Sequence, residues 1–166
     1  AARTRSVVMF IGSLMHYLDV FSLPQSGGCK LGSRTVRPHF YALEHFGVKI
    51  NTTDDPFEVK VKRSKKTKRE IVLYESGDTV TENAILAAAL TPGKTVIKYA
   101  SANYMVQEVC AFLVKAGVGI EGIGTTTLTV TGLSELDTDI EYTLSEDPTD
   151  SMFFLAAAIL TNSSIT

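Results

Sequence analysis

The distribution of apolar and polar positions predicts a chain in which helices and strands alternate. Five segments are predicted to be helices: residues 5–17, 36–46, 79–90, 104–116 and 150–160. Eight shorter segments are predicted to be strands: residues 20–23, 48–51, 57–63, 70–74, 95–99, 119–122, 127–131 and 139–144. This order is typical of the mixed α/β class.

Three of the predicted helices lack the polar face that a helix lying on a sheet normally presents to water. Residues 84–90 and 152–160 are almost entirely apolar, and residues 5–14 are similar. We expect these helices to be buried on all sides. The strand at residues 127–131 instead reads Thr-Leu-Thr-Val-Thr, so one of its faces is wet. The pattern therefore predicts helices at the centre of the domain and sheets outside.

Two kinds of helix recur along the chain, which indicates an internal repeat. The Ala triplets at residues 87–89 and 156–158 are 69 residues apart. Gly47 and Gly117, which end two helices of the other kind, are 70 residues apart. The repeating order is predicted to be βαβαββ.

The repeat also predicts how the chain is divided. Repeat-like units are expected at about residues 20–90 and 91–160. Residues 1–166 are then a partial single domain, a fragment with about two repeats and part of a third.

Charge is unevenly distributed, although the net charge is only −2. Residues 1–70 carry 13 Lys and Arg against 6 Asp and Glu, whereas residues 71–166 carry 3 against 12. Much of the positive excess lies in residues 60–69, for which we expect a solvated hairpin with its turn at residues 64–68. Binding of nucleic acid or phosphoinositide by this basic segment is the less favoured alternative.

Composition excludes several classes of protein. With 45% apolar and 20% charged residues the chain is globular, and its apolar runs are too short to cross a bilayer. Two cysteines do not form a disulfide framework, which favours a reducing compartment, the cytoplasm. Cys29, His39 and Cys110 do not have the spacing of a zinc site.

A glycine-rich connection is the strongest candidate for chemistry. Residues 24–34 read Pro-Gln-Ser-Gly-Gly-Cys-Lys-Leu-Gly-Ser-Arg and are longer than the matching connection after residues 95–99. Lys30 and Arg34 would favour the thiolate of Cys29. A lid that closes on an anionic substrate would have this composition. The alternative is an ordinary surface loop with an incidental cysteine.

Other polar residues are given structural roles. Cys110 lies on an apolar helix face and is expected in the core. Thr79 and Glu82 have the spacing of a capping box. Asp147 and Asp150 are expected to begin the last helix rather than form a catalytic pair.

Residues 4–50 resemble the enolpyruvyl transferases. The motifs that carry the resemblance are Arg5 at the start of a helix, Ser22-Leu-Pro24, Gly27-Gly-Cys-Lys-Leu-Gly-Ser-Arg34, and His39 ahead of Leu43-Glu-His-Phe-Gly-Val. Residues 81–88, 112–118, 124–132 and 154–159 are similar to the same family. The resemblance covers nearly the whole chain, which spans less than half of the usual family length.

The resemblance implies a fold and a reaction. The family fold is an inside-out α/β barrel in each of two domains, and this chain would be most of the N-terminal domain, without the second. The implied reaction moves the enolpyruvyl group of phosphoenolpyruvate to the 3-hydroxyl of UDP-N-acetylglucosamine, the first committed step of peptidoglycan synthesis. No metal or organic cofactor, nucleic acid or membrane is implied.

The resemblance also assigns residues. Cys29 matches the general acid that forms a covalent adduct with phosphoenolpyruvate and is alkylated by fosfomycin. Arg34 matches an arginine that closes the loop on anionic ligands, and Arg5 one that contacts the nucleotide sugar. The remaining substrate-binding positions fall in two stretches. The uridine-binding stretch holds Thr35, Val36, Arg37, Pro38 and His39, and a second nucleotide-binding stretch holds Glu75, Ser76 and Gly77.

Departures from the family pattern leave alternatives open. Arg37 stands where an acidic residue usually reads uracil, and a cation cannot accept the uracil N–H. Glu75 is unusual so near a diphosphate. A paralogue acting on another nucleotide, or less favourably on shikimate 3-phosphate, fits these changes. A non-catalytic barrel that binds a partner through residues 60–69 is the rival from another class. The chain alone is expected to be inactive, because the second domain supplies further arginines and the base.

Overall fold

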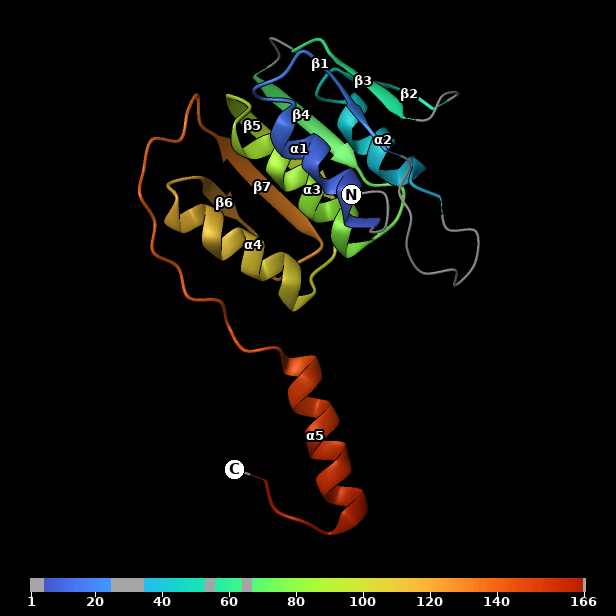
Figure 1. Ribbon diagram of the computed structural model, residues 1–166. Coiled ribbons are helices and arrows are strands. Elements are labelled where there is room, and N and C mark those ends of the chain that lie inside the picture. Colours follow the sequence, from blue (N-terminus) through green and yellow to red (C-terminus); the bar gives the residue numbers. More distant parts are fainter. Residues whose placement is uncertain (1–4, 25–34, 53–55, 64–66, 166) are drawn as a thin grey trace.

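The computed structural model describes residues 5–24, 35–52, 56–63 and 67–165, which form two sheets on the outside of a group of helices (Figure 1). The first sheet has the order β1-β3-β2 and is antiparallel. Its strands are β1 (Val20–Leu23), β2 (Val48–Asn51) and β3 (Phe57–Val61). The second has the order β4-β5-β7-β6, with β4 and β5 parallel and the other pairs antiparallel. Its strands are β4 (Lys68–Val72), β5 (Gly93–Lys98), β6 (Gly119–Glu121) and β7 (Thr127–Gly132).

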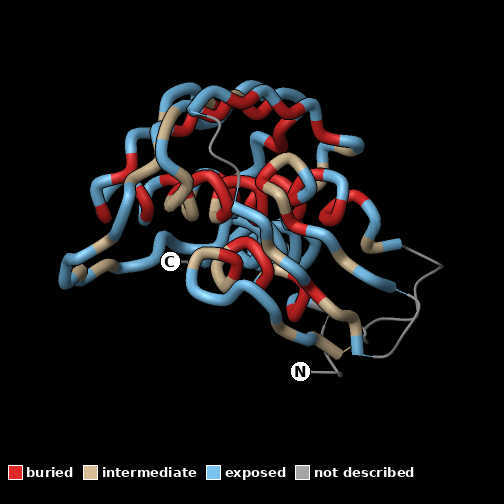
Figure 2. Tube along the Cα trace, turned by 90° about the horizontal axis from the view of Figure 1, so that it is seen from above, coloured by how far each residue is buried: buried red, intermediate tan, exposed pale blue. Residues whose placement is uncertain are grey.

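One helix lies at the centre of the domain. The helices are η1 (Arg5–Met9, a 3-10 helix), α1 (Phe10–Leu14), α2 (Arg37–Glu44), α3 (Asp78–Ala89), α4 (Tyr104–Lys115) and α5 (Pro148–Thr161). Helix α3 packs against α1, α2, α4 and β7, and nine of its residues are buried. Figure 2 shows the buried residues gathered in this interior. None of the helices in the described ranges is long and apolar enough to cross a membrane.

The strands have the alternation expected of sheets with one wet face. In β4, Arg69 and Ile71 are buried, whereas Lys68 and Glu70 are exposed. The neighbouring strand β5 shows the same alternation of buried and exposed residues. On the outer face, Lys98 of β5 forms an ion pair with Glu70 of β4 (2.9 Å). Helices inside and sheets outside confirm the predicted fold class.

The predicted βαβαββ order is complete from β4 to β7. Helix α1 and the elements that follow it, β1, α2, β2 and β3, have the same order without the first strand. The strand orders also correspond, because β1-β3-β2 matches β5-β7-β6. The boundaries at about residues 20–90 and 91–160 remain a prediction.

Two local expectations are wrong because strand pairing is decided by distant residues. β3 and β4 do not form a hairpin, since they belong to different sheets. The basic residues of this segment therefore do not share one solvated hairpin: Lys60 on β3 pairs with Glu58, Arg63 pairs with Asp19, and Arg69 on β4 is buried over the Phe46 ring.

The other expectation concerns residues 139–144, which form no strand. This segment is instead attached to α4 by side chains. The Glu108 carboxylate accepts hydrogen bonds from the Tyr142 hydroxyl (3.0 Å) and from the backbone N–H and hydroxyl of Ser145 (2.8 and 2.7 Å). These bonds lower the pKa of Glu108.

Helix α5 begins as predicted but is not buried. The Asp147 carboxylate caps it by accepting from the Thr149 N–H (2.7 Å). Ala158 is its only buried residue, and Leu160 is 87% exposed. Residues 133–147 carry the helix away from the body (Figure 1). The expectation of burial on all sides is thus confirmed for α3 and wrong for α5. It is also wrong for residues 5–14, because Phe10 on this segment is 59% exposed.

The α1–α3 contact depends on a glycine. A Cβ atom at Gly12 would lie 2.4 Å from Asn83 Oδ1 and 2.6 Å from the Asn83 backbone oxygen. One of these atoms is backbone, so the helices would have to separate to make room. Gly12 therefore sets how closely η1 and α1 approach the centre.

We expect Gly12→Ala to destabilise the intact protein by about 3 kcal/mol, because the added methyl group overpacks a helix contact. Chemical denaturation measures the effect. The control is Ser13→Ala, one residue further along the helix, where the side chain is half-exposed and the expected change is within about 0.5 kcal/mol. Equal stability of Gly12→Ala and the parent would show that this approach is not required.

Candidate functional site

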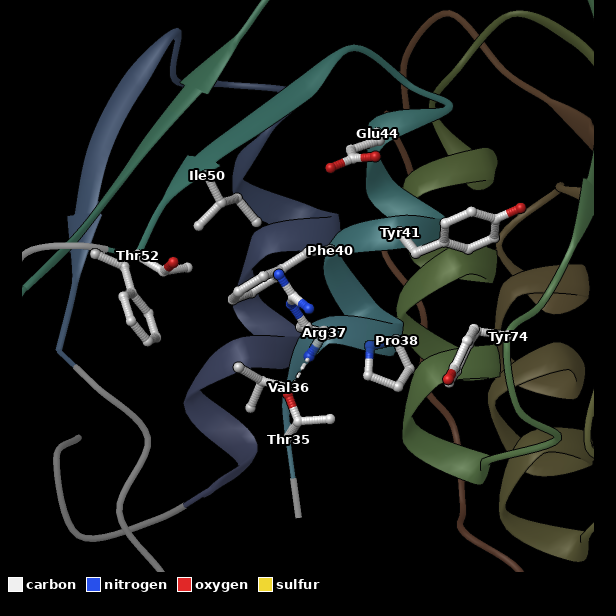
Figure 3. A pocket seen from close by; sticks show the side chains of 11 residues that line it. Thr35, Val36, Arg37, Pro38, Phe40, Tyr41, Glu44, Ile50, Thr52 and Tyr74 are labelled. Atoms are coloured by element: carbon white, nitrogen blue, oxygen red, sulfur yellow. Dashed lines mark hydrogen bonds between the residues drawn. The ribbon is translucent and has the colours of Figure 1, made fainter. Parts of the chain in front are cut away.

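A cavity of about 860 Å³ opens beside the N-terminus of α2 (Figure 3). It collects residues from α2, the first sheet and the segment after β4. The lining consists of Thr35, Val36, Arg37, Pro38, Phe40, Tyr41, Glu44, Ile50, Thr52, Phe57 and Tyr74. It is the strongest candidate for a ligand site in the described part of the chain.

Helical spacing explains why α2 supplies much of the wall. Arg37, Phe40, Tyr41 and Glu44 are separated by three, one and three residues, which places them on neighbouring positions of one helix face. The Phe40 ring packs edge-to-face on Phe57, with centroids 5.8 Å apart. This pair joins α2 to β3 and makes one side of the cavity apolar.

The N-terminal end of α2 favours an anion. Thr35 precedes the helix, and its hydroxyl oxygen accepts from the Arg37 backbone N–H (3.2 Å). No acidic residue lies in the first turn. The helix dipole and the Arg37 guanidinium therefore both place positive charge here. In Figure 3 Arg37 extends between Phe40 on one side and Pro38 and Tyr74 on the other.

The structure brings together four of the five residues in the predicted uridine-binding stretch. Thr35, Val36, Arg37 and Pro38 all line the cavity. His39 does not, because it is on the opposite side of the helix, 5% exposed and within hydrogen-bond distance of Asn83. His39 can thus act on a ligand in this cavity only through other residues.

The second predicted stretch lies at the start of α3 and outside the cavity wall. The Ser76 hydroxyl donates to the Ala100 carbonyl (3.2 Å), and Gly77 is the N-cap of α3. A Cβ atom at Gly77 would be 3.1 Å from the Glu75 carboxylate, so that carboxylate lies close over the glycine. The predicted Thr79–Glu82 capping box is wrong, because the helix begins two residues earlier than Thr79 would require.

Sequence reasoning missed the aromatic and acidic part of the wall. Tyr41 and Glu44 could have been found by counting four and seven residues along the helix from Arg37, which are positions on the same helix face. Tyr74, whose side chain is 75% exposed, precedes the predicted Glu75 and carried no signal of its own.

The side chains of three predicted site residues lie outside the described part of the structure. Cys29 and Arg34 lie outside the described residues, although Arg34 directly precedes Thr35 in the sequence. Arg5 begins η1, and its side chain is also outside the described part.

The second thiol is structural, as expected. Cys110 is completely buried on α4. Burial raises its pKa to about 11, and the nearby Glu82 carboxylate adds to this shift. Glu82 is itself buried, which raises its pKa, and Asp78 one turn earlier raises it further. Among the described residues no group of His, Cys, Asp and Glu could hold a metal ion.

Comparisons of sequence place the chain among carboxyvinyltransferases. A family model described as EPSP synthase (3-phosphoshikimate 1-carboxyvinyltransferase) matches residues 8–166. UDP-N-acetylglucosamine 1-carboxyvinyltransferase of Thermobifida fusca is 37% identical over 154 residues, or 93% of this chain and 36% of the relative. The Treponema denticola protein of the same name is 34% identical, over 97% of this chain and 37% of the relative. The chain thus spans a little over a third of the length of these relatives.

Solved structures agree on the fold. The enolpyruvyl transferase NikO from Streptomyces tendae superposes with a TM-score of 0.73 at 20% identity, over 91% of this chain and 36% of that one. EPSP synthase from Acinetobacter baumannii gives a TM-score of 0.71 at 15% identity, over 94% and 35%. At these identities the likeness concerns the fold alone.

We expect Cys110 to resist thiol reagents in the folded protein, because with a pKa of about 11 roughly one thiol in a thousand is ionised at pH 8. Peptide mapping after brief exposure to a disulfide reagent should find Cys110 modified at least about 100-fold more slowly than after denaturation. The variant Cys110→Ser should leave the total thiol labelling of the folded protein unchanged. Rapid native modification of Cys110 would contradict its burial.

Proposed function

This chain belongs to the EPSP synthase family of enolpyruvyl transferases, and from that premise we propose that it forms part of the active site of an enzyme acting on UDP-N-acetylglucosamine. The enzyme would transfer the enolpyruvyl group of phosphoenolpyruvate to the 3-hydroxyl of the sugar and release phosphate. The observation that carries the proposal is the cavity at α2, which is lined by Thr35–Pro38 residues of the predicted uridine-binding stretch. The names and the 34–37% identities of the two relatives support the same acceptor.

The chemistry requires a proton donor and positive charge. In the addition step the sugar oxygen bonds to C2 of phosphoenolpyruvate, while its own proton leaves to a base and the methylene carbon gains a proton. In the second step that carbon loses a proton as the C2–O bond to phosphate breaks. We assign proton delivery to the methylene carbon to Cys29. Both steps run through side chains, so the proposal includes no cofactor.

Cations are assigned to the anionic ligands. Arg34 and Arg5 would meet phosphate and carboxylate groups, for which a guanidinium offers a fork of donors. The N-terminus of α2 would add its dipole beside the nucleotide. Glu75, Ser76 and Gly77 would border the nucleotide from the start of α3, the carboxylate limiting how near a diphosphate comes.

The remaining partner would be the rest of a longer polypeptide. The relatives are nearly three times as long as the matched region, so we assign the base and further arginines to parts outside this chain. In a cell the reaction would be the first committed step of peptidoglycan synthesis. The low cysteine content favours the cytoplasm as its place.

We expect Cys29→Ala in the intact protein to reduce enolpyruvyl transfer by about 100-fold or more, the loss typical for a positioned proton donor. Phosphate release in the presence of both substrates measures it. Cys110→Ala is the matched control, since it removes the buried thiol, and it should keep most of the activity. Fosfomycin should label the parent and not Cys29→Ala. Full activity of Cys29→Ala would refute the assigned role.

Arg37 favours a second candidate function, in which the acceptor substrate is a different nucleotide. Its guanidinium lines the cavity and can only donate hydrogen bonds, so it suits a base or substituent that presents acceptor atoms. The N3–H of uracil would face this donor unfavourably. The candidate is therefore an enolpyruvyl transferase for a nucleotide with another base.

A panel of N-acetylglucosamine nucleotides tests this candidate in the intact protein. If Arg37 reads an acceptor edge, a nucleotide other than the uridine one has the higher kcat/KM, and Arg37→Asp reverses the order by about tenfold, the net contribution of one hydrogen bond. Arg37→Gln serves as a control because it removes the charge and adds no acidic group. Preference for the uridine nucleotide that is unchanged by Arg37→Asp would reject the candidate.

A further inference from the structure

A buried amide interrupts the first helix of the domain. Gly12 donates its backbone N–H to Asn83 Oδ1 (2.9 Å), and Asn83 Nδ2 donates to the Val8 carbonyl (3.2 Å). Val8 and Gly12 are four residues apart and would bond to each other in an uninterrupted α-helix. The Asn83 amide takes the place of that bond. Helix type changes at this point, from the 3-10 helix η1 to the α-helix α1.

The same amide reaches a third helix. Asn83 Nδ2 lies 3.2 Å from His39 Nδ1 on α2. An amide nitrogen can only donate, so Nδ1 accepts and the ring proton is on Nε2. Asn83 is completely buried, and its two N–H groups and its oxygen are all used. A single side chain of α3 thus holds η1, α1 and α2.

Both ligand-binding elements of the proposed site are attached to this point. Arg5 is three residues before Val8 on η1, and Arg37 is two residues before His39 on α2. The position of each therefore depends on a bond to Asn83. Under the proposed function the two arginines contact different parts of one nucleotide sugar.

We propose that Asn83 is a positioning residue, which sets the distance between Arg5 and the cavity at α2 so that both contact the same nucleotide sugar. This inference rests on the proposed function. It differs from a purely structural role because the effect of Asn83 must pass through Arg5 and Arg37.

A double-mutant cycle in the intact protein tests the inference. Asn83→Ala should raise the KM for UDP-N-acetylglucosamine at least tenfold and change kcat less than threefold. In a background that carries both Arg5→Ala and Arg37→Ala the same substitution should raise KM less than threefold, because both residues being positioned are gone. Leu128→Ala on β7, a buried residue that does not line the cavity, is the control for lost stability and should leave KM unchanged. Effects that multiply independently would overturn the proposal.

Two further measurements keep the test decisive. Asn83→Asp keeps the acceptor for Gly12 and loses the donors to Val8 and His39, so it should also raise KM if Asn83→Ala does not fold. Hydrogen exchange of residues 5–14, followed by mass spectrometry, should accelerate at least tenfold in either variant, and unchanged exchange would overturn the anchoring of η1. If the parent protein does not transfer enolpyruvyl groups, the proposed function fails, whereas the exchange result still decides whether Asn83 holds the three helices.

Discussion

The close approach of α1 to α3 is the contact on which the rest of the domain depends. It is possible because Gly12 has no side chain and because the Asn83 amide satisfies the backbone groups that the approach leaves open. A buried N–H or carbonyl without a partner costs about 1–3 kcal/mol, so an apolar residue at position 83 would leave both groups unsatisfied. With this contact in place, the two sheets can cover the helices from outside, and α2 can present its N-terminus at the edge of the first sheet.

Much of this arrangement could be predicted from the sequence. The absence of a polar face around Ala84 and Ala88 predicted the buried central helix, and the alternation in residues 127–131 predicted a sheet with one wet face. Both signals are local, since they depend on which side chains a helix or strand must hide. The stretch from Thr35 to Pro38 was predicted by resemblance, and the cavity gives it a physical setting.

What could not be predicted depends on distant residues. The assignment of β3 and β4 to different sheets is decided by pairing with β1, β2 and β5, which no local pattern reveals. The attachment of residues 142 and 145 to Glu108 is again a contact between separated segments. His39 resembled a ligand-binding residue in sequence, yet the helix turns it toward Asn83. Tyr74 reaches the cavity from the segment that follows β4, a strand of the other sheet.

The central claim is that the nucleotide sugar binds in the cavity at α2. A crystal structure of the intact protein with UDP-N-acetylglucosamine would test it most directly, because it shows where this ligand binds. The account predicts that the nucleotide occupies the cavity between Arg37 and Tyr74, with its charged groups toward Arg5 and the start of α2. A nucleotide bound elsewhere, with the cavity at α2 empty, would contradict it.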